Sequence, residues 1–194
     1  YDLIDEPIPR AQRIGAINII KREKSGKLLG DMTDGIGCIN ALRLNGFSVT
    51  GKKIGLIGGG GAGSAIADAI GEHRAAQLSL VEIDKLKSDT LLLKLQKQYP
   101  ALTLENNISR PEEIDIVINA SPLGMNKNDL LPIDPYTFRS GIVIADSVTK
   151  PNFTPFLKSA KNNGCFIQKG SEMADAQLPI FLDFLGTPPE NSHV

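Results

Sequence analysis

The chain has 194 residues, enough for one well-buried core and a second small unit. It is 41% hydrophobic and 22% charged with a formal net charge of −1, so no basic excess indicates nucleic acid or an anionic membrane as a partner. No apolar stretch reaches the length of a membrane span, and the two cysteines and two histidines do not stand at metal-ligand spacing. We expect a cytoplasmic protein with reduced thiols and without a metal.

The first predicted elements are paired strands and a helix. Residues 12–30 contain an apolar run at 15–20, a charged turn and a short apolar pair at 28–29, which predicts a hairpin. A helix over 34–44 follows, for which Thr33 or Asp34 is suited as the N-cap.

From Lys53 onward, β-rich runs alternate with helix-like runs. We expect helices at 62–72, 86–98 and 154–160, and strands at 54–57, 78–81, 102–104, 114–118, 142–145 and 165–168. This alternation predicts an α/β fold with a doubly wound, mostly parallel sheet, the Rossmann-type dinucleotide-binding architecture. A last helix over 173–185 carries Phe181, Leu182 and Leu185, which we expect to serve core packing only.

The most informative stretch lies where the first strand of this alternating unit passes into a helix. Gly58, Gly60 and Gly63 satisfy G-x-G-x-x-G, and Gly61 and Ala62 complete the turn. Such glycines let the backbone approach a pyrophosphate, which the unpaired N–H groups of the helix start then bind. A flexible linker is the alternative, but linkers are seldom bounded by apolar runs on both sides. The pattern indicates a dinucleotide site.

The choice of dinucleotide depends on the end of the second strand of this unit. Glu82 stands about 24 positions after Gly58, where an acidic residue binds the adenosine ribose hydroxyls of NAD. Lys85 and Lys87 follow, either to meet the 2′-phosphate of NADP or as the solvated start of a helix. We expect NAD, with NADP as the alternative.

Five blocks, in chain order from Arg10 to Gly186, resemble motifs of the shikimate dehydrogenase family. GAIN at 15–18 resembles the family's G-A-V-N, GDMTDG at 30–35 resembles G-x-N-T-D-G, GGGGA at 58–62 resembles G-A-G-G-A, VINASPLGM at 117–125 resembles I-N-A-T-P-x-G-M, and GSEMADAQ at 170–177 resembles G-x-x-M-L-x-x-Q. Met32 and Thr149 depart from the usual Asn and Tyr, which leaves the ring substrate open.

The resemblance implies hydride transfer between NAD(P) and a hydroxylated cyclohexene or cyclohexane carboxylate. In the family a Lys–Asp pair takes the hydroxyl proton, and the Asp corresponds to Asp34. Asn18, Thr33 and Gln177 would bind ring hydroxyls. The residues alone also allow a helix cap for Asp34 or Thr33, a hairpin Asn and a solvent-facing Gln.

The remaining candidate residues belong to the cofactor side. Asn119 and Ser121 follow a buried strand at the rim where open α/β sheets bind ligands. Met125 and Met173 would flank the nicotinamide, although filling the core is the commoner use of Met, and Gly170 is counted with the same site.

The resemblance also implies a domain organisation. Residues 1–33 would end an N-terminal substrate domain whose upstream part carries the catalytic Lys, 34–169 would form the dinucleotide domain, and 170–194 a helix returning to the substrate cleft. We expect the chain alone to bind a dinucleotide without turnover, and a homodimer stays open. The alternatives are a non-catalytic nucleotide- or metabolite-binding module and another Rossmann enzyme such as a methylene-folate dehydrogenase.

Overall fold

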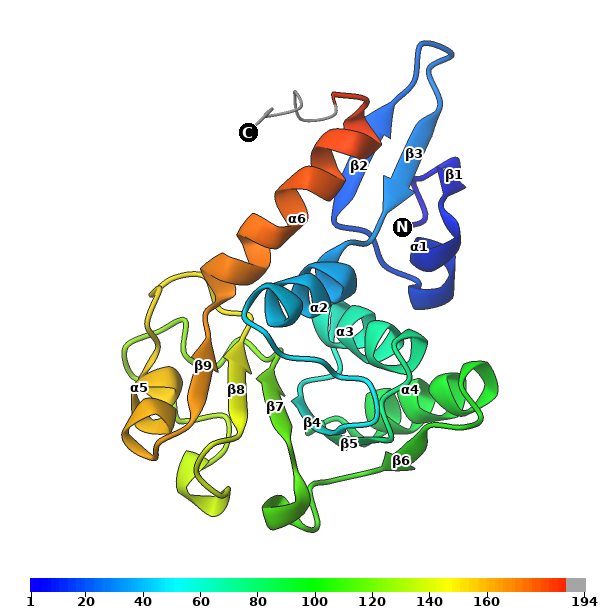
Figure 1. The fold of residues 1–194 in the computed structure, drawn as a ribbon. Coiled ribbons are helices and arrows are strands. Elements are labelled where there is room, and N and C mark those ends of the chain that lie inside the picture. The colour runs from blue at the N-terminus through cyan, green and yellow to red at the C-terminus, as the bar shows by residue number, and fades with distance from the viewer. Residues whose placement is uncertain (188–194) are drawn as a thin grey trace.

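The computed structural model describes residues 1–187, which contain two sheets (Figure 1). In the smaller sheet, β3 (Leu28–Asp31) lies between β1 (Glu6–Pro7) and the antiparallel β2 (Ile19–Arg22), so the expected hairpin is confirmed. Helix α1 (Pro9–Ile14) between β1 and β2 was not predicted, because six residues are too few for a periodic signal.

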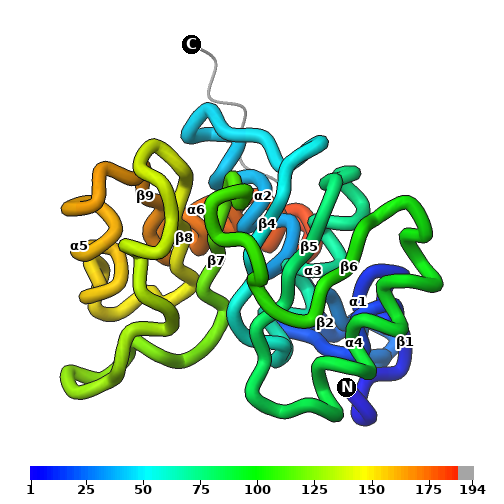
Figure 2. Tube along the Cα trace, turned by 90° about the horizontal axis from the view of Figure 1, so that it is seen from below, coloured from blue at the N-terminus to red at the C-terminus, as the bar shows by residue number. Residues whose placement is uncertain are grey.

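The larger sheet has the order β6-β5-β4-β7-β8-β9, and all its neighbouring strands are parallel. Its strands are β4 (Lys53–Ile57), β5 (Gln77–Val81), β6 (Thr103–Glu105), β7 (Ile116–Asn119), β8 (Val143–Asp146) and β9 (Phe166–Gln168). Figure 2 shows them following one another across the molecule. The chain builds outward from β4 on one side and then from β7 on the other, so the strand order switches between these two strands. The expected doubly wound sheet is confirmed.

Two apolar layers cover the faces of this sheet. One contains α2 (Asp34–Leu44), α3 (Gly61–Glu72), α4 (Lys85–Gln98) and the first half of α6 (Gly170–Leu185). The other contains α5 (Pro155–Asn162) and the buried ring of Phe138. Short 3-10 turns at Pro111–Glu113 and Pro135–Thr137 lead toward β7 and β8. The strands therefore have apolar side chains on both faces, as a sheet covered by helices on both sides requires.

The two ends of α6 differ, and the prediction for its last residues is wrong. Met173 and Ala176 are buried in the first layer, whereas the second half extends past the sheet to contact β2 (Figure 1). There Leu185 is 44% exposed, and Phe181 and Leu182 are only half-buried. The expected last unit, 170–194, includes residues 188–194, which lie outside the described residues. Within residues 1–187, no helix has the length and apolar character needed to cross a membrane.

Candidate active site

Four side chains singled out in the sequence meet at the start of α2. Asn18 Nδ2 donates to Asp34 Oδ1 at 2.8 Å, to Thr33 Oγ1 at 3.1 Å and to Gln177 Oε1 at 3.3 Å. Thr33 Oγ1 donates to Gln177 Oε1 at 2.9 Å. A single hydrogen-bonded cluster thus joins the approach to β2, the start of α2 and the middle of α6, although Asn18 and Gln177 are 159 positions apart.

Thr33 occupies the N-cap position of α2 as expected, whereas the N-cap alternative for Asp34 and the solvent-facing alternative for Gln177 are wrong. Helix α2 begins at Asp34, so Asp34 is not its N-cap, and Thr33, which is, makes no side-chain capping bond. Thr33 is fully buried and Gln177 is 6% exposed, because both side chains face the cluster. Asn18 does pair with the hairpin through its backbone N–H, which donates to Asp31 O, but its amide side chain points to Asp34.

The surroundings of Asp34 change the pKa of its carboxyl. Burial raises its pKa, and the hydrogen bonds from Asn18 and Gln177 offset only part of this effect. A carboxylate with a raised pKa is a better proton acceptor near neutral pH than an ordinary aspartate.

Asp34 and Gln177 line an open cleft of about 350 Å³ at the carboxyl ends of β4, β7 and β8. The start of α3, the loops after β7 and β8 and the start of α6 form the other walls, which include Ala62, Ser121, Met125, Ser147, Thr149, Gly170 and Met173. This is the rim beside the switch in strand order, where open α/β sheets bind ligands. The cleft therefore joins the substrate-side and cofactor-side candidates.

Sequence reasoning gave Ser147 no role, and it noted Thr149 only as a departure from the usual Tyr; both line the cleft and follow β8 at the carboxyl edge. That position is the signal that identifies them. Met173 packs in the core, where it is 5% exposed, and also lines the cleft, whereas Met125 lines the cleft at 56% exposed.

The fingerprint glycines fall into two groups. A Cβ at Gly58, where φ is +97°, would lie 2.9 Å from the backbone of Ala120, and one at Gly63 would lie 2.0 Å from Gly58 O. Conformation and packing therefore explain both. Gly60 has a φ of −70°, and a Cβ there would have no atom within 4 Å. Nothing in the protein requires glycine at this position, but a closely approaching ligand would.

The first turn of α3, which follows the glycine turn, has no side-chain cap and no acidic residue. Gly60 is the N-cap of this helix. The first backbone N–H groups and the positive end of the helix dipole are thus left for a ligand. Together with the open space at Gly60, this fits the pyrophosphate of a dinucleotide.

Glu82 comes directly after β5 and is tied to the fingerprint turn. Its Oε2 accepts the N–H of Gly59 at 2.6 Å, and its Oε1 accepts the N–H of Asp84 at 2.9 Å. Burial acts to raise the Glu82 pKa, but the N–H groups of Asp84 and Gly59, aided by Lys87, hold it below its usual value. Lys85 pairs with Asp89 at 2.8 Å, so this side chain has a partner on its own helix. A charged carboxylate is thereby fixed beside the turn.

Asn119 lies behind the cleft wall and not in it. It is fully buried, and its Oδ1 accepts the N–H of Ser121 at 3.0 Å and the hydroxyl at 2.6 Å. Its Nδ2 donates to Asp146 Oδ1 at 2.9 Å and Leu123 O at 3.1 Å. Because all its polar atoms are engaged, the expected direct cofactor contact is corrected to a role in holding Ser121.

Asp146 is the buried partner that sequence reasoning missed. Besides Asn119, it binds the hydroxyl of Thr154, the N-cap of α5, at 2.7 Å, and burial raises its pKa. The signal was its place at the end of β8, in register with Asn119 at the end of β7.

Other site chemistries find no support among residues 1–187. No group of three His, Cys, Asp or Glu side chains gathers there to hold a metal ion. Cys38 and Cys165 are buried and free, and burial raises the pKa of Cys38 to about 12, so this thiol stays protonated at neutral pH.

Comparisons with known proteins agree with this geometry. No family model matches the chain. A shikimate dehydrogenase (NADP(+)) from Bacillus cereus is 32% identical over 176 residues, which are 89% of this chain and 63% of that protein. The chain thus spans less than two thirds of the length of the curated relatives it matches.

Two solved structures share the fold. The 5-ketofructose reductase of a Gluconobacter strain is 32% identical with a TM-score of 0.84, covering 95% of this chain and 68% of that one. A quinate dehydrogenase from Corynebacterium glutamicum, in complex with NAD, is 26% identical with the same TM-score of 0.84, covering 97% and 69%. On its motifs, its fold and these relatives, the chain belongs to the shikimate/quinate dehydrogenase family.

Proposed function

We propose that this chain carries the dinucleotide site and one side of the alcohol site of an NAD(P)-dependent dehydrogenase. Its substrate would be a hydroxylated cyclohexene or cyclohexane carboxylate of the shikimate or quinate type. The observation that carries the proposal is the single cleft that brings Asp34 and Gln177 to the first turn of α3. The relatives named for shikimate and quinate support the substrate class.

Each cluster residue has a role that its chemistry suits. The Asp34 carboxylate accepts the hydroxyl proton as the alcohol is oxidised, while the bound nicotinamide supplies the hydride chemistry. Asn18 and Gln177 have both donors and acceptors, which is what recognition of hydroxyl groups needs. Thr33 is fully buried and does not line the cleft, so in place of the ring-hydroxyl contact expected from the resemblance it would hold the Gln177 amide in place.

On the cofactor side, the pyrophosphate would bind at Gly60 and the first turn of α3, through the exposed N–H groups of Gly61 and Ala62. Ser121, Met125, Gly170 and Met173 would enclose the nicotinamide end, since all four line the cleft. Gly170 must be glycine for packing as well, because its Cβ would lie 2.3 Å from Val148 O. Residues 1–33 would form the inner edge of the substrate domain.

We further propose NAD as the preferred cofactor. Glu82 stays charged and would accept both ribose hydroxyls of NAD, but it would face the 2′-phosphate of NADP. Like charges about 4 Å apart cost about 1 kcal/mol in water and about 4 kcal/mol near a protein surface, which amounts to a preference of about fivefold to several hundredfold. The Bacillus cereus relative is named for NADP and the quinate dehydrogenase was solved with NAD, so the two relatives do not agree on one cofactor. The proposal of NAD therefore rests on the charge of Glu82.

A second candidate substrate is a keto-sugar. The 5-ketofructose reductase is as similar in sequence as the Bacillus relative, and Met32 and Thr149 depart from the usual motifs. The chemistry at Asp34 would be the reverse, with the protonated carboxyl giving its proton to the forming hydroxyl.

The test is turnover by the full-length protein, followed through the absorbance of reduced nicotinamide. Shikimate and quinate would be offered with NAD and NADP, and 5-ketofructose with their reduced forms, with Asp34→Asn as the control. We expect the wild type to oxidise one of the ring carboxylates and the Asp34→Asn variant to lose this activity. Reduction of the keto-sugar alone would favour the second candidate, and dinucleotide binding with no turnover would favour the non-catalytic module.

A further inference from the structure

Two arginines one turn apart on α1 each bind a buried aspartate. Arg10 Nε donates to Asp31 Oδ1 at 2.7 Å, and its Nη2 pairs with Asp31 Oδ2. Arg13 donates to both carboxylate oxygens of Asp68 at 3.0 to 3.4 Å. Asp31 ends β3 of the small sheet, whereas Asp68 lies on α3, the helix that begins at the fingerprint. Helix α1 therefore connects the two units.

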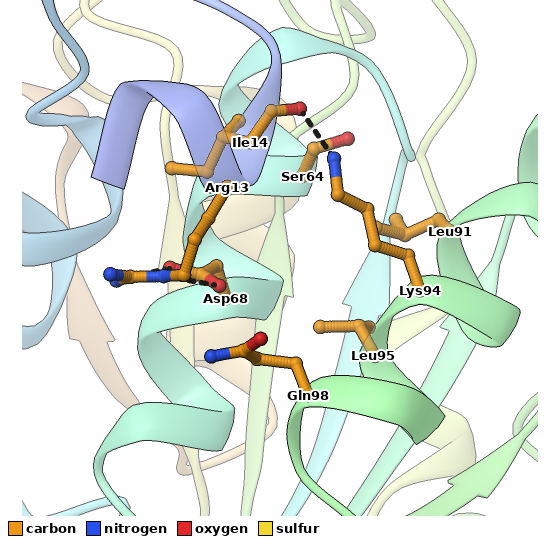
Figure 3. Close-up of a pocket in the computed structure, with 8 residues that line it drawn as sticks. All are labelled: Arg13, Ile14, Ser64, Asp68, Leu91, Lys94, Leu95 and Gln98. Carbon is orange, nitrogen blue, oxygen red and sulfur yellow. Dashed lines mark hydrogen bonds and ion pairs between the residues drawn. The ribbon is translucent and has the colours of Figure 1, made fainter. Parts of the chain in front are cut away.

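The contact on the α3 side is reinforced by α4 and by the residue directly after it. Tyr99 donates its hydroxyl to Asp68 Oδ1 at 2.8 Å, and Lys94 Nζ donates to Ile14 O at 3.1 Å. In Figure 3 the Arg13 side chain runs to Asp68, and Lys94 reaches from α4 to the carbonyl at the end of α1. Asp68 is only 8% exposed, so its pairing with Arg13 is largely screened from water.

An apolar contact underlies these polar ones. A small buried cluster, separate from the two layers of the main sheet, contains Ala11 of α1, Ala65 of α3 and Met32, which precedes α2. Helix α1 is thus fitted between α3 and the segment that leads to Asp34.

The docking of α1 affects the cluster at the cleft because Asn18 lies only a short way beyond this helix. The chain passes from α1 through Gly15 to Asn18 within four residues. Asp34 is fixed independently, since α2 packs so closely on α3 that a Cβ at Gly35 would lie 2.1 Å from Ala65 O. The position of Asn18 relative to Asp34 therefore depends on how α1 sits on α3, together with the direct bonds of Asn18 to Asp31 O and to the Thr33 N–H.

We propose that Arg13 is a positioning residue that, through Asp68 and Lys94, holds Asn18 in register with Asp34. Arg13 does not line the cleft that contains Asp34 and Gln177. The Arg10–Asp31 pair keeps α1 on the small sheet, so loss of the Arg13 contact frees this unit to shift against α3 as a whole. The proposal deepens the proposed function and rests on it.

The first test is kinetic, on the full-length protein. Arg13→Met keeps the apolar stem and removes the charge, Arg13→Lys keeps the charge, and Arg22→Met in the exposed hairpin is the matched control. We expect Arg13→Met to bind the dinucleotide as the wild type does but to lose about tenfold or more in kcat/KM for the alcohol, since displacements of about 1 Å cost up to about 100-fold. Arg13→Lys should recover part of the loss, and Arg22→Met should behave as wild type.

The second test needs no turnover. Amide hydrogen exchange should rise across residues 9–18 in Arg13→Met and stay unchanged around the fingerprint. If Arg13→Met does not fold, Tyr99→Phe removes one bond to Asp68 without a change of charge and should show the same pattern more weakly.

Three outcomes separate the two proposals. An active Arg13→Met with wild-type kcat/KM and exchange would overturn the positioning role. A parallel loss of dinucleotide affinity would also overturn it, because the contact would then support α3 and not Asn18. A wild type without turnover would refute the proposed function, and the exchange measurement would still decide the role of Arg13.

Discussion

A methyl group at Gly60 should separate ligand binding from stability. Gly60 has a φ of −70°, and its Cβ would meet no atom within 4 Å, so the folded chain accepts alanine there. Alanine restricts the unfolded chain more than glycine does, which stabilises the folded state by about 0.4–1 kcal/mol. Alanine is a poorer N-cap than glycine by a similar amount. We therefore expect Gly60→Ala to change the free energy of unfolding by less than about 1 kcal/mol, which is a shift in Tm of no more than about 4 °C.

The same methyl group would occupy the space through which a pyrophosphate reaches the N–H groups of α3. Hydrogen bonds to charged groups contribute about 1.5–3 kcal/mol each, so weakening one should raise the dinucleotide Kd about 10- to 100-fold. Gly63→Ala is the matched control, because its Cβ would lie 2.0 Å from Gly58 O and should destabilise the fold by about 1–3 kcal/mol or more. Calorimetric titration with NAD and NADP and thermal melting measure the two effects. A stable Gly60→Ala variant that binds as tightly as the wild type would refute the assignment of the phosphate site.

Asp34→Asn should lower kcat about 10²- to 10⁴-fold with little change in dinucleotide Kd, whereas Gln177→Ala should raise KM more than it lowers kcat. Equal, small effects would reduce Asp34 to a structural residue. Because burial raises the Asp34 pKa, kcat/KM should fall on acidification from a pH above the ordinary value of about 3.9. The Asp34 charge opposes folding above that raised pKa, so Asp34→Asn should not lower Tm at neutral pH, and a lower Tm would contradict this sign. Glu82→Ala should weaken NAD binding and tighten NADP binding; a wild type that already prefers NADP would show that Lys85 and Lys87 set the choice.

The alternation of strands and helices could be predicted because each run in the large sheet is buried on both faces. The glycine turn could also be predicted, because backbone conformation and close packing within the turn and its neighbours require glycine at Gly58 and Gly63. Helix α1 and the half-exposed end of α6 were not, because their surroundings come from distant segments. Apolar residues such as Leu185 predict burial only where another element covers them.

The candidate site shows the same division. Asp34 and Gln177 came from family motifs, which record roles but not contacts. That Asn18 bonds to both, and that Asn119 turns away to hold Ser121, depends on register between segments far apart in the chain. Asp146 was missed because its partners are assembled only when β7 and β8 pair.

The most direct test of the central claim is the structure of the full-length protein with NAD(P) and the alcohol bound. We expect the pyrophosphate over Gly60 at the start of α3, the nicotinamide in the cleft between Ser121 and Met173, and the alcohol oxygen within hydrogen-bonding distance of Asp34. A dinucleotide bound elsewhere, or an alcohol remote from Asp34, would contradict that claim.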